Sequence, residues 1–186
     1  LLIRGPNVMM GYWNNPAATA AIISSDGWLN SGDIASIDAQ GHVTITGRLK
    51  EIIVLSTGEK IPPADMEAAI LRDPLFEQAM LIGEARSYLS VMVVLNTAHW
   101  QNVVSQYGLD ASLNTDQQRQ QVEEILLDKI TEQTSEFPGY AKIRRVALIQ
   151  EPWNVENGLL TPTLKLKRAK VLEKYVREVE RLYAGH

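Results

Sequence analysis

A stripe of apolar side chains at helical spacing constrains the fold of this chain more than any other feature. Within residues 116–136, charged and polar residues surround an apolar repeat formed by Val122, Ile125, Leu126 and Ile130. A helix that is apolar along one side must bury that side against another apolar layer. We therefore expect a long helix packed on a hydrophobic core.

Shorter patterns divide the rest of the chain. We predict helices over residues 16–23, 63–72, 98–107 and 169–183, the last with an apolar stripe at Leu172, Val176, Val179 and Tyr183. Strands are expected over residues 1–4, 34–38, 42–46, 52–55, 78–82, 89–95 and 145–149. The fold class is therefore α+β, with a short β-rich N-terminal piece (1–47) followed by a compact mixed α/β domain (48–186).

Composition excludes several classes of protein. The net charge of −4 argues against a general nucleic-acid binder, so no nucleic-acid partner is expected. The absence of cysteine excludes disulfides and thiolate chemistry and fits a reducing, cytoplasmic location. No apolar run approaches the ~18 residues of a membrane span. The histidines, His42, His99 and His186, lack metal-ligand spacing, and no metal site is expected.

Residues 158–168 contain the most suggestive candidate for catalysis. They are expected to form a short irregular segment that brings Lys165 just before a basic helix. A lysine ammonium is a compact charge with three donors, suited to neutralising charge that develops on a carboxylate or a phosphate. The cations that follow are interpreted as a solvated helix face, with attraction of a nucleotide phosphate or an acidic lipid as the alternative: Lys167, Arg168, Lys170 and Lys174.

Two charged segments near the domain boundary each allow two interpretations. Residues 31–33 are either a surface turn or a site at which the Asp33 carboxylate accepts hydrogen bonds from a diol such as ribose. Residues 47–51 are either a solvated linker or a hinge in which Lys50 absorbs the backbone change. In the second case Arg48 would hold the ribose or phosphate of a nucleotide.

The turn around Gly58 is the third candidate. Residues 56–63 are either an ordinary link from a strand to a helix or a turn that presents its backbone to a ligand. Glycine between Thr57 and Glu59 permits such a close approach. There is no glycine-rich phosphate loop in the sequence.

The order of these motifs resembles that of the adenylate-forming (AMP-binding) enzymes, which include acyl-CoA synthetases, luciferases and peptide-synthetase adenylation domains. The matching positions span nearly the whole chain: Gly5, Val8, 11–13, Pro16 and Thr19, 28–33, 41–53, Gly58, Ile61, Pro63, Asp65, Glu67, 137–143 and 161–168. Residues 160–168 and 182–186 resemble the long-chain fatty acyl-CoA synthetases in particular. Two positions depart from the usual pattern, Ser31 in place of threonine and Leu164 in place of the glycine before the catalytic lysine.

The resemblance implies a two-step reaction. A carboxylate attacks the α-phosphate of ATP to give an acyl-adenylate; the C-terminal domain then rotates, and coenzyme A takes up the acyl group as a thioester. The roles implied by position are ribose binding by Asp33, nucleotide contact by Arg48, a hinge at Lys50, a loop for the thioester-forming state at Thr57, Gly58 and Glu59, and catalysis of adenylation by Lys165. ATP, Mg²⁺ and coenzyme A are the implied ligands of the full-length enzyme.

The resemblance also implies a division of the chain. Residues 1–47 would be the tail of a large AMP-binding domain and residues 48–186 its mobile lid. We expect a C-terminal fragment that is inactive alone, with the upstream domain, a fatty acid and coenzyme A as partners. Three alternatives stay open: a carrier-protein or other acceptor in place of coenzyme A, a non-catalytic interaction module, and weak peripheral membrane contact through the basic final helix.

Overall fold

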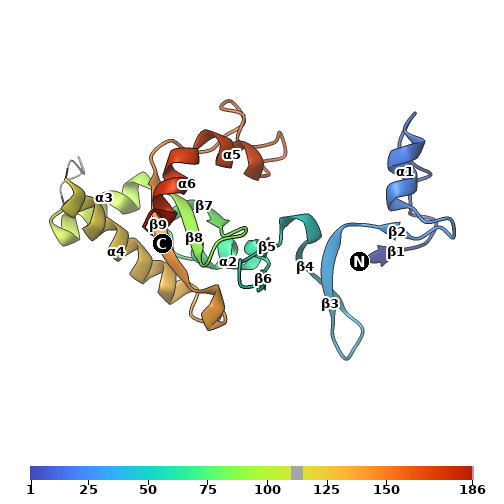
Figure 1. The fold of residues 1–186 in the computed structure, drawn as a ribbon, viewed down its shortest axis with the longest axis horizontal. Coiled ribbons are helices and arrows are strands. Elements are labelled where there is room, and N and C mark those ends of the chain that lie inside the picture. The colour runs from blue at the N-terminus through green and yellow to red at the C-terminus, as the bar shows by residue number, and fades with distance from the viewer. Residues whose placement is uncertain (110–114, 186) are drawn as a thin grey trace. The chain divides into compact units, whose positions relative to one another are not determined.

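The computed structural model describes residues 1–109 and 115–185 and divides into two compact units, Leu1–Ile52 and Ile53–His186 (Figure 1). His186, one of the histidines considered above, lies outside the described residues.

The first unit consists of small antiparallel ribbons. Strand β1 (Leu2–Ile3) pairs with β2 (Leu29–Asn30), and β3 (Asp33–Ile37) pairs with β4 (Val43–Arg48). Helix α1 (Pro16–Ile22) begins at Asn15, whose side chain accepts the Ala18 N–H. A 3₁₀ turn, η1 (Leu49–Glu51), follows β4. The predicted hairpin is confirmed, although its second strand continues to Arg48.

This first unit has no hydrophobic core of its own. None of residues 1–52 is buried, and the large side chains of Met10 and Trp13 are almost completely exposed. An independently stable piece of protein of this size usually buries some of its large apolar side chains. The ribbons are therefore held together mainly by their backbone ladders.

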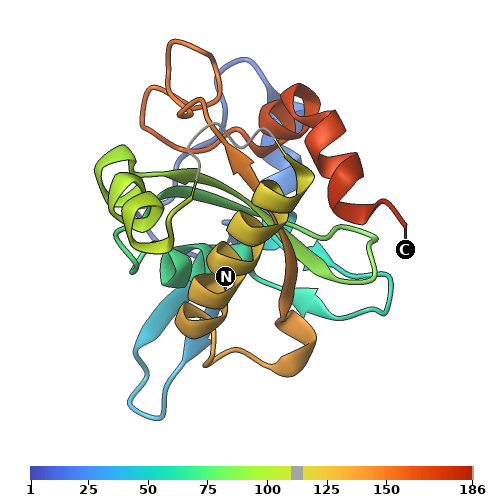
Figure 2. The same ribbon diagram turned by 90° about the vertical axis from the view of Figure 1, so that its left-hand side faces the viewer.

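The second unit is built on a three-stranded sheet in the order β7 (Phe76–Ile82), β8 (Leu89–Leu95), β9 (Ile143–Ile149). Strands β7 and β8 are antiparallel, whereas β8 and β9 are parallel because α3 (Thr97–Tyr107) and α4 (Asp116–Gln133) connect them. Helix α4 lies across the sheet (Figure 2). A separate ribbon, β5 (Ile53–Val54) with β6 (Lys60–Ile61), precedes α2 (Pro63–Ile70), and a 3₁₀ turn, η2 (Gly139–Ala141), precedes β9.

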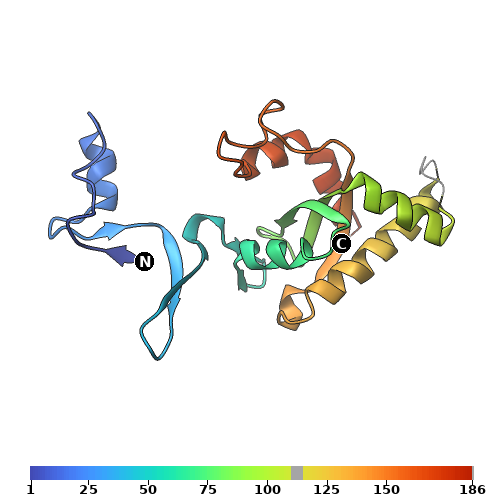
Figure 3. The same cartoon turned by 180° about the vertical axis from the view of Figure 1, so that it is seen from behind.

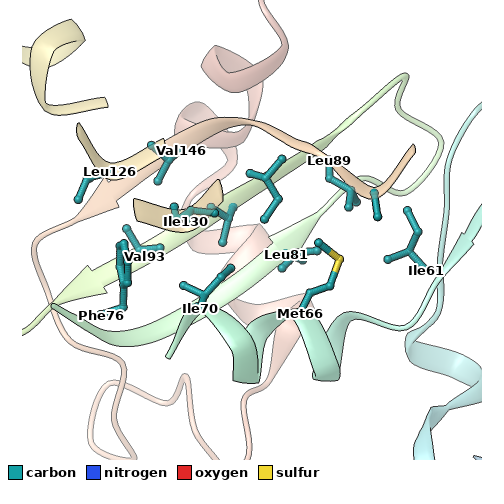
Figure 4. Close-up of a cluster of buried hydrophobic side chains, with 14 of the residues drawn as sticks. Ile61, Met66, Ile70, Phe76, Leu81, Leu89, Val93, Leu126, Ile130 and Val146 are labelled. Atoms are coloured by element: carbon teal, nitrogen blue, oxygen red, sulfur yellow. The ribbon is translucent and has the colours of Figure 1, made fainter. Parts of the chain in front are cut away.

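Both faces of this sheet are covered by helices. Leu89, Val91 and Val93 point into a core shared with α2 and α4, which Figure 4 shows in close-up. Met92 and Val94 point to the other side, into a core shared with α5 (Arg168–Lys174) and α6 (Val176–Tyr183). Burial of both faces explains why residues 89–95 are apolar without alternation. The expected α+β class, with a compact mixed domain, is confirmed.

The long helix also agrees with its pattern. Val122, Leu126 and Ile130 are buried on the sheet, and Ile125 packs beside them half-buried. The helix ends at Gln133 rather than at residue 136, and the ends of the other elements differ from their predicted positions by similar small shifts.

The prediction for the last helix was correct only in part: Val179 and Tyr183 of the expected stripe are buried, but the helix is not continuous. It breaks at Tyr175, whose backbone (φ −108°, ψ 30°) is not helical. Leu172 and Val176 are exposed, and Val171 is buried with Val179 in the core beneath the sheet. The segment has apolar residues on two neighbouring faces, one with Val171 and one with Leu172 and Val176. Packing against the sheet buries the face that contains Val171.

Candidate active site

Lys165 lies on the short irregular segment that was predicted, and a single bridge closes this segment into a tight hairpin. Leu160 and Leu166 form an antiparallel bridge, and the Lys167 N–H donates to the Leu159 carbonyl at 2.9 Å. At the tip, the Lys165 N–H donates to Thr161 Oγ1 at 3.0 Å, and the Thr161 N–H donates to the Lys165 carbonyl at 2.8 Å. The orange loops before α5 in Figure 3 contain this hairpin.

The ammonium of Lys165 is available for a ligand. Its side chain is exposed, and within residues 1–109 and 115–185 it forms no ion pair and no side-chain hydrogen bond. Because the backbone on both sides is hydrogen-bonded, the hairpin fixes the position from which this exposed cation is presented.

Leu164, next to Lys165, has the left-handed backbone conformation, with φ of +60°. The Leu164 N–H donates to the Thr161 carbonyl at 2.8 Å, which closes the turn. For a residue with a Cβ atom, this conformation is less favourable by about 1–2 kcal/mol of free energy. The turn geometry therefore accounts for the glycine that is usual at this position in the family that the sequence resembles.

The basic residues after Lys165 are not all solvated, contrary to the interpretation from sequence. Arg168 Nη1 lies 2.7 Å from Glu67 Oε1 on α2, and its Nη2 donates to the Leu81 carbonyl on β7 at 2.6 Å. Lys174 pairs with Glu151 at 2.6 Å, and this contact raises the pKa of Lys174 and lowers that of Glu151. Long-range contacts, which no local pattern reveals, neutralise half of the predicted basic face.

Asp33 and Arg48 come together in the first unit. They are partners in the β3–β4 ladder, and Arg48 Nε lies 3.0 Å from Asp33 Oδ1. The Asp33 N–H donates to Ser31 Oγ at 3.1 Å, so the hydroxyl at position 31 supports the turn. The pair uses Nε of the guanidinium and leaves its two terminal nitrogens outside this contact. A carboxylate and a fork of donors thus lie side by side on one hairpin.

Lys50 lies in the 3₁₀ turn η1, immediately before the division between the two units. Arg48 before this turn has an extended backbone, and Ile52 after it has φ of −57° and ψ of 127°. The side chain of Lys50 is exposed. A single short turn between two compact units is a segment in which a change of backbone dihedrals costs few contacts.

The turn at Thr57, Gly58 and Glu59 joins the strands of the β5–β6 ribbon, with Thr57 and Gly58 exposed and Glu59 half-buried. The Gly58 N–H donates to the Leu55 carbonyl at 2.9 Å, and φ of Gly58 is +94°, a value that other residues rarely adopt. A hydrogen bond from the Thr57 side chain lowers the pKa of Glu59. The space around the Gly58 Cα is open, so its backbone can approach a ligand closely.

Sequence reasoning missed the structural role of Glu67. Its Oε1 accepts hydrogen bonds from Arg168 and from the Leu81 N–H, the latter at 2.7 Å. The signal that could have found this pair is the match of both residues to motif positions. In the described parts of the chain there is no group of three or more side chains able to hold a metal ion, and no helix with the length and apolarity needed to cross a bilayer.

Comparison with known proteins identifies the family. The family model described as "AMP-binding enzyme C-terminal domain" matches residues 50–186. The chain belongs to the AMP-binding enzyme family. The resemblance inferred from the motifs is therefore confirmed, and the matched range includes Lys50, the loop at 57–59 and the Lys165 hairpin.

Similar AMP-binding proteins of known sequence include ligases of fatty acids. The chain is 34% identical to the probable acyl-activating enzyme 16, chloroplastic, of Arabidopsis thaliana, over 97% of this chain and 26% of that protein. It is 35% identical to the putative fatty-acid–CoA ligase fadD11 of Mycobacterium tuberculosis, over 99% of this chain and 32% of the ligase. The chain thus spans only about a quarter to a third of the length of these relatives.

A solved structure of an AMP-binding enzyme has the same fold. The adenylation domain of a carboxylic acid reductase from Segniliparus rugosus, in complex with AMP and a co-purified carboxylic acid, superposes with a TM-score of 0.82 at 28% identity. The match covers 98% of this chain and 27% of that one. The fold of this chain is accordingly that of the C-terminal part of an adenylate-forming enzyme.

Proposed function

We propose that this chain is the C-terminal part of an ATP-dependent acyl-CoA ligase that activates a fatty acid, long-chain by preference. The observation that carries the proposal is the Lys165 hairpin, whose exposed ammonium has no partner among the described residues, in a unit that belongs to the AMP-binding family. The similarity to fatty-acid–CoA ligases supports the substrate class. The enzyme would be cytoplasmic.

In the first step Lys165 acts by charge. A carboxylate oxygen of the fatty acid attacks the α-phosphorus of ATP, the bond to the β-phosphate oxygen breaks, and pyrophosphate leaves. Negative charge accumulates on the oxygens between the two reactants. The Lys165 ammonium neutralises this charge, as a positioned cation can do most effectively where water is excluded.

The nucleotide would be held by the first unit. Asp33, oriented by Arg48, accepts hydrogen bonds from the ribose hydroxyls, and the terminal nitrogens of Arg48 donate to nucleotide oxygens. The donor and acceptor types at this pair fit a ribose phosphate. Mg²⁺, if bound with ATP, would supply charge neutralisation at the phosphates.

In the second step the thiol sulfur of coenzyme A attacks the acyl carbonyl carbon, the thiol proton is lost, and AMP leaves with the bonding electron pair. The backbone of Thr57, Gly58 and Glu59 lines the site in this state. Rotation about Lys50 exchanges this loop for the Lys165 hairpin. The open space and the left-handed backbone at Gly58 support the close approach that this role requires.

Residues 1–47 would then be the tail of the large AMP-binding domain, and residues 48–186 the lid. The upstream large domain would cover the apolar side chains that the first unit exposes, among them Met10 and Trp13. The isolated chain would be inactive. Peripheral membrane contact through α5 receives less support than the sequence suggested, because Arg168 and Lys174 are paired within the chain.

The test uses the intact enzyme that carries this chain. Lys165→Ala should reduce pyrophosphate release from ATP and fatty acid by about 10²–10³-fold, yet leave the conversion of supplied acyl-adenylate to acyl-CoA unchanged. Lys170→Ala, which removes another exposed cation nearby, is the matched control. Equal loss of both half-reactions in the Lys165 variant, or no loss in either, would overturn the assignment.

A carrier protein is the second candidate acceptor. The chain is 31% identical, over 98% of its length, to the long-chain-fatty-acid–[acyl-carrier-protein] ligase AEE15, chloroplastic, of Arabidopsis thaliana. Assays of the intact enzyme with coenzyme A and, separately, with a phosphopantetheinylated carrier protein distinguish the two. Acyl transfer to the carrier protein alone would replace coenzyme A in the proposal.

A further inference from the structure

We propose that Glu67 and Arg168 are positioning residues that fix the base of the Lys165 hairpin. The kinetic consequence of this inference rests on the function proposed above, whereas its structural part does not. The two residues lie 101 positions apart, on α2 and at the start of α5. They form hydrogen bonds to each other and to Leu81, and any effect on the Lys165 ammonium is therefore indirect.

The contacts of the pair join three elements. Arg168 Nη1 donates to Glu67 Oε1 at 2.7 Å while its Nη2 donates to the Leu81 carbonyl at 2.6 Å. The Leu81 N–H donates back to the same Glu67 oxygen at 2.7 Å. Only 21% of the Arg168 side chain and 16% of the Glu67 side chain are exposed, so solvent screens the pair weakly. These hydrogen bonds form a closed ring that includes both the N–H and the carbonyl of Leu81 on β7.

This ring holds the outgoing side of the hairpin. The hairpin ends where the Lys167 N–H donates to the Leu159 carbonyl, and Arg168 is the next residue. The first residue of α5 is therefore attached to α2 and β7 immediately after the hairpin closes. Above this base, hydrogen bonds at the tip join residues of the turn between Thr161 and Lys165.

The incoming side is held by β7 as well. Gln78 accepts the Trp153 N–H at 2.7 Å through Oε1 and donates to the Trp153 carbonyl at 2.8 Å through Nε2. Leu159, at the start of the hairpin, is buried in the core that the sheet shares with α5 and α6. Strand β7 thus supports both sides of the hairpin. Gln78 binds the segment that precedes the hairpin, and Leu81 binds Arg168 directly after it.

The chemistry of the pair requires an arginine at position 168. A planar guanidinium can donate to the Glu67 carboxylate and to the Leu81 carbonyl at the same time, whereas a lysine ammonium is a point charge on a flexible chain. At position 67 a glutamine retains an acceptor oxygen for both donors. Arg168→Lys should therefore behave much like Arg168→Ala, and Glu67→Gln should retain much of the wild-type behaviour while Glu67→Leu should not.

The structural test is amide hydrogen exchange in the full 186-residue chain. In Arg168→Ala and Arg168→Lys, the amides of Lys165 and Lys167 should exchange at least about tenfold faster than in wild type, because the base of the hairpin opens more often. Amides of β8 should be unchanged. Lys174→Ala, which removes the other ion pair of α5, is the matched control. Unchanged protection at Lys165 and Lys167 would overturn the proposal.

The kinetic test uses the intact enzyme. Arg168→Ala and Glu67→Leu should lower kcat for adenylation by about 10–100-fold with little change in KM for ATP, since a misplaced group loses rate and not nucleotide binding. Conversion of supplied acyl-adenylate to the thioester should stay at the wild-type rate, and Glu67→Gln should recover most of the adenylation rate. A merely structural role would reduce both half-reactions together.

Parallel measurement of Lys165→Ala separates the two hypotheses. If Lys165→Ala abolishes adenylation and the Arg168 and Glu67 variants do not affect it, the positioning proposal is wrong and the proposed function stands. If Lys165→Ala has no effect, the proposed function is wrong, and hydrogen exchange alone decides whether the pair fixes the hairpin. If Arg168→Ala does not fold, Arg168→Lys provides the same comparison, with Glu67→Gln as the variant expected to retain the wild-type adenylation rate.

Discussion

Asp33 and Arg48 face each other across the β3–β4 ladder, with Arg48 Nε 3.0 Å from Asp33 Oδ1. Only 18% of the Asp33 side chain is exposed, against 58% of the Arg48 side chain. The carboxylate is therefore held in one orientation, while the guanidinium extends toward solvent. Two residues that the sequence suggested separately, for ribose and for nucleotide contact, form a single pair.

Loss of the Asp33 carboxylate should weaken nucleotide binding in the intact enzyme. A charge-assisted hydrogen bond contributes about 1.5–3 kcal/mol, so Asp33→Asn should raise KM for ATP by roughly 10–100-fold. Asp38→Asn, on the turn of the same hairpin, removes a carboxylate that pairs with His42 and serves as the control. Steady-state kinetics at varied ATP measure the effect, and an unchanged KM would exclude Asp33 from the nucleotide site.

A stiffer connection between the two units should affect the second step alone. Proline at position 50 restricts φ in the turn η1, so Lys50→Pro should leave pyrophosphate release largely intact and slow thioester formation. Lys50→Ala removes the same side chain without stiffening the backbone and should resemble wild type. Rapid-quench measurement of each half-reaction makes the comparison. Normal thioester formation in the proline variant would show that the hinge lies elsewhere.

The backbone strain at Leu164 should lower the free energy of unfolding by a measurable amount. Leu164→Gly removes the cost of a left-handed conformation, partly offset by the greater freedom of glycine in the unfolded chain, and should stabilise by up to about 1 kcal/mol. Leu164→Val adds a β-branched side chain at the same backbone angles and should destabilise. Urea unfolding of the full chain followed by circular dichroism gives both values. A glycine variant less stable than the valine variant would contradict the argument.

Stability at alkaline pH should depend on Tyr183. Its hydroxyl donates to the Ile82 carbonyl at 3.0 Å, and burial raises the pKa of Tyr183 above its ordinary value of 10.0. The unfolded chain therefore loses this proton first, so stability is full below pH 10 and falls as pH rises toward the folded pKa.

Tyr183→Phe removes this dependence along with the hydrogen bond. The variant should be less stable by about 1 kcal/mol near pH 8, and the difference from wild type should shrink above pH 10. Tyr107→Phe, at an exposed position on α3, is the control for alkaline effects elsewhere in the chain. Urea unfolding at both pH values tests the prediction, and a difference that widens with pH would reverse its sign.

Much of the fold follows from local pattern. The apolar repeat of Val122, Leu126 and Ile130 identifies both the helix and its buried side, since side chains three and four residues apart share one face. The hairpin of β3 and β4 follows from alternating residues and turn signals. The order of the motifs was sufficient to recognise the AMP-binding family, because each motif is a short stretch whose spacing is visible without a structure. The roles of Lys165, Lys50 and the loop at Gly58 stay predictions.

By itself the sequence determined most of the helices and strands, the family and the residue types of the candidate site. Only the tertiary structure decided that Arg168 pairs with Glu67, that Tyr175 interrupts the last helix and that Val171 rather than Leu172 is buried. Periodicity reports how residues a few positions apart are arranged on one element. Partners 101 residues apart meet only because the sheet brings α2 and α5 to the same strand, and this placement depends on the packing of the whole domain.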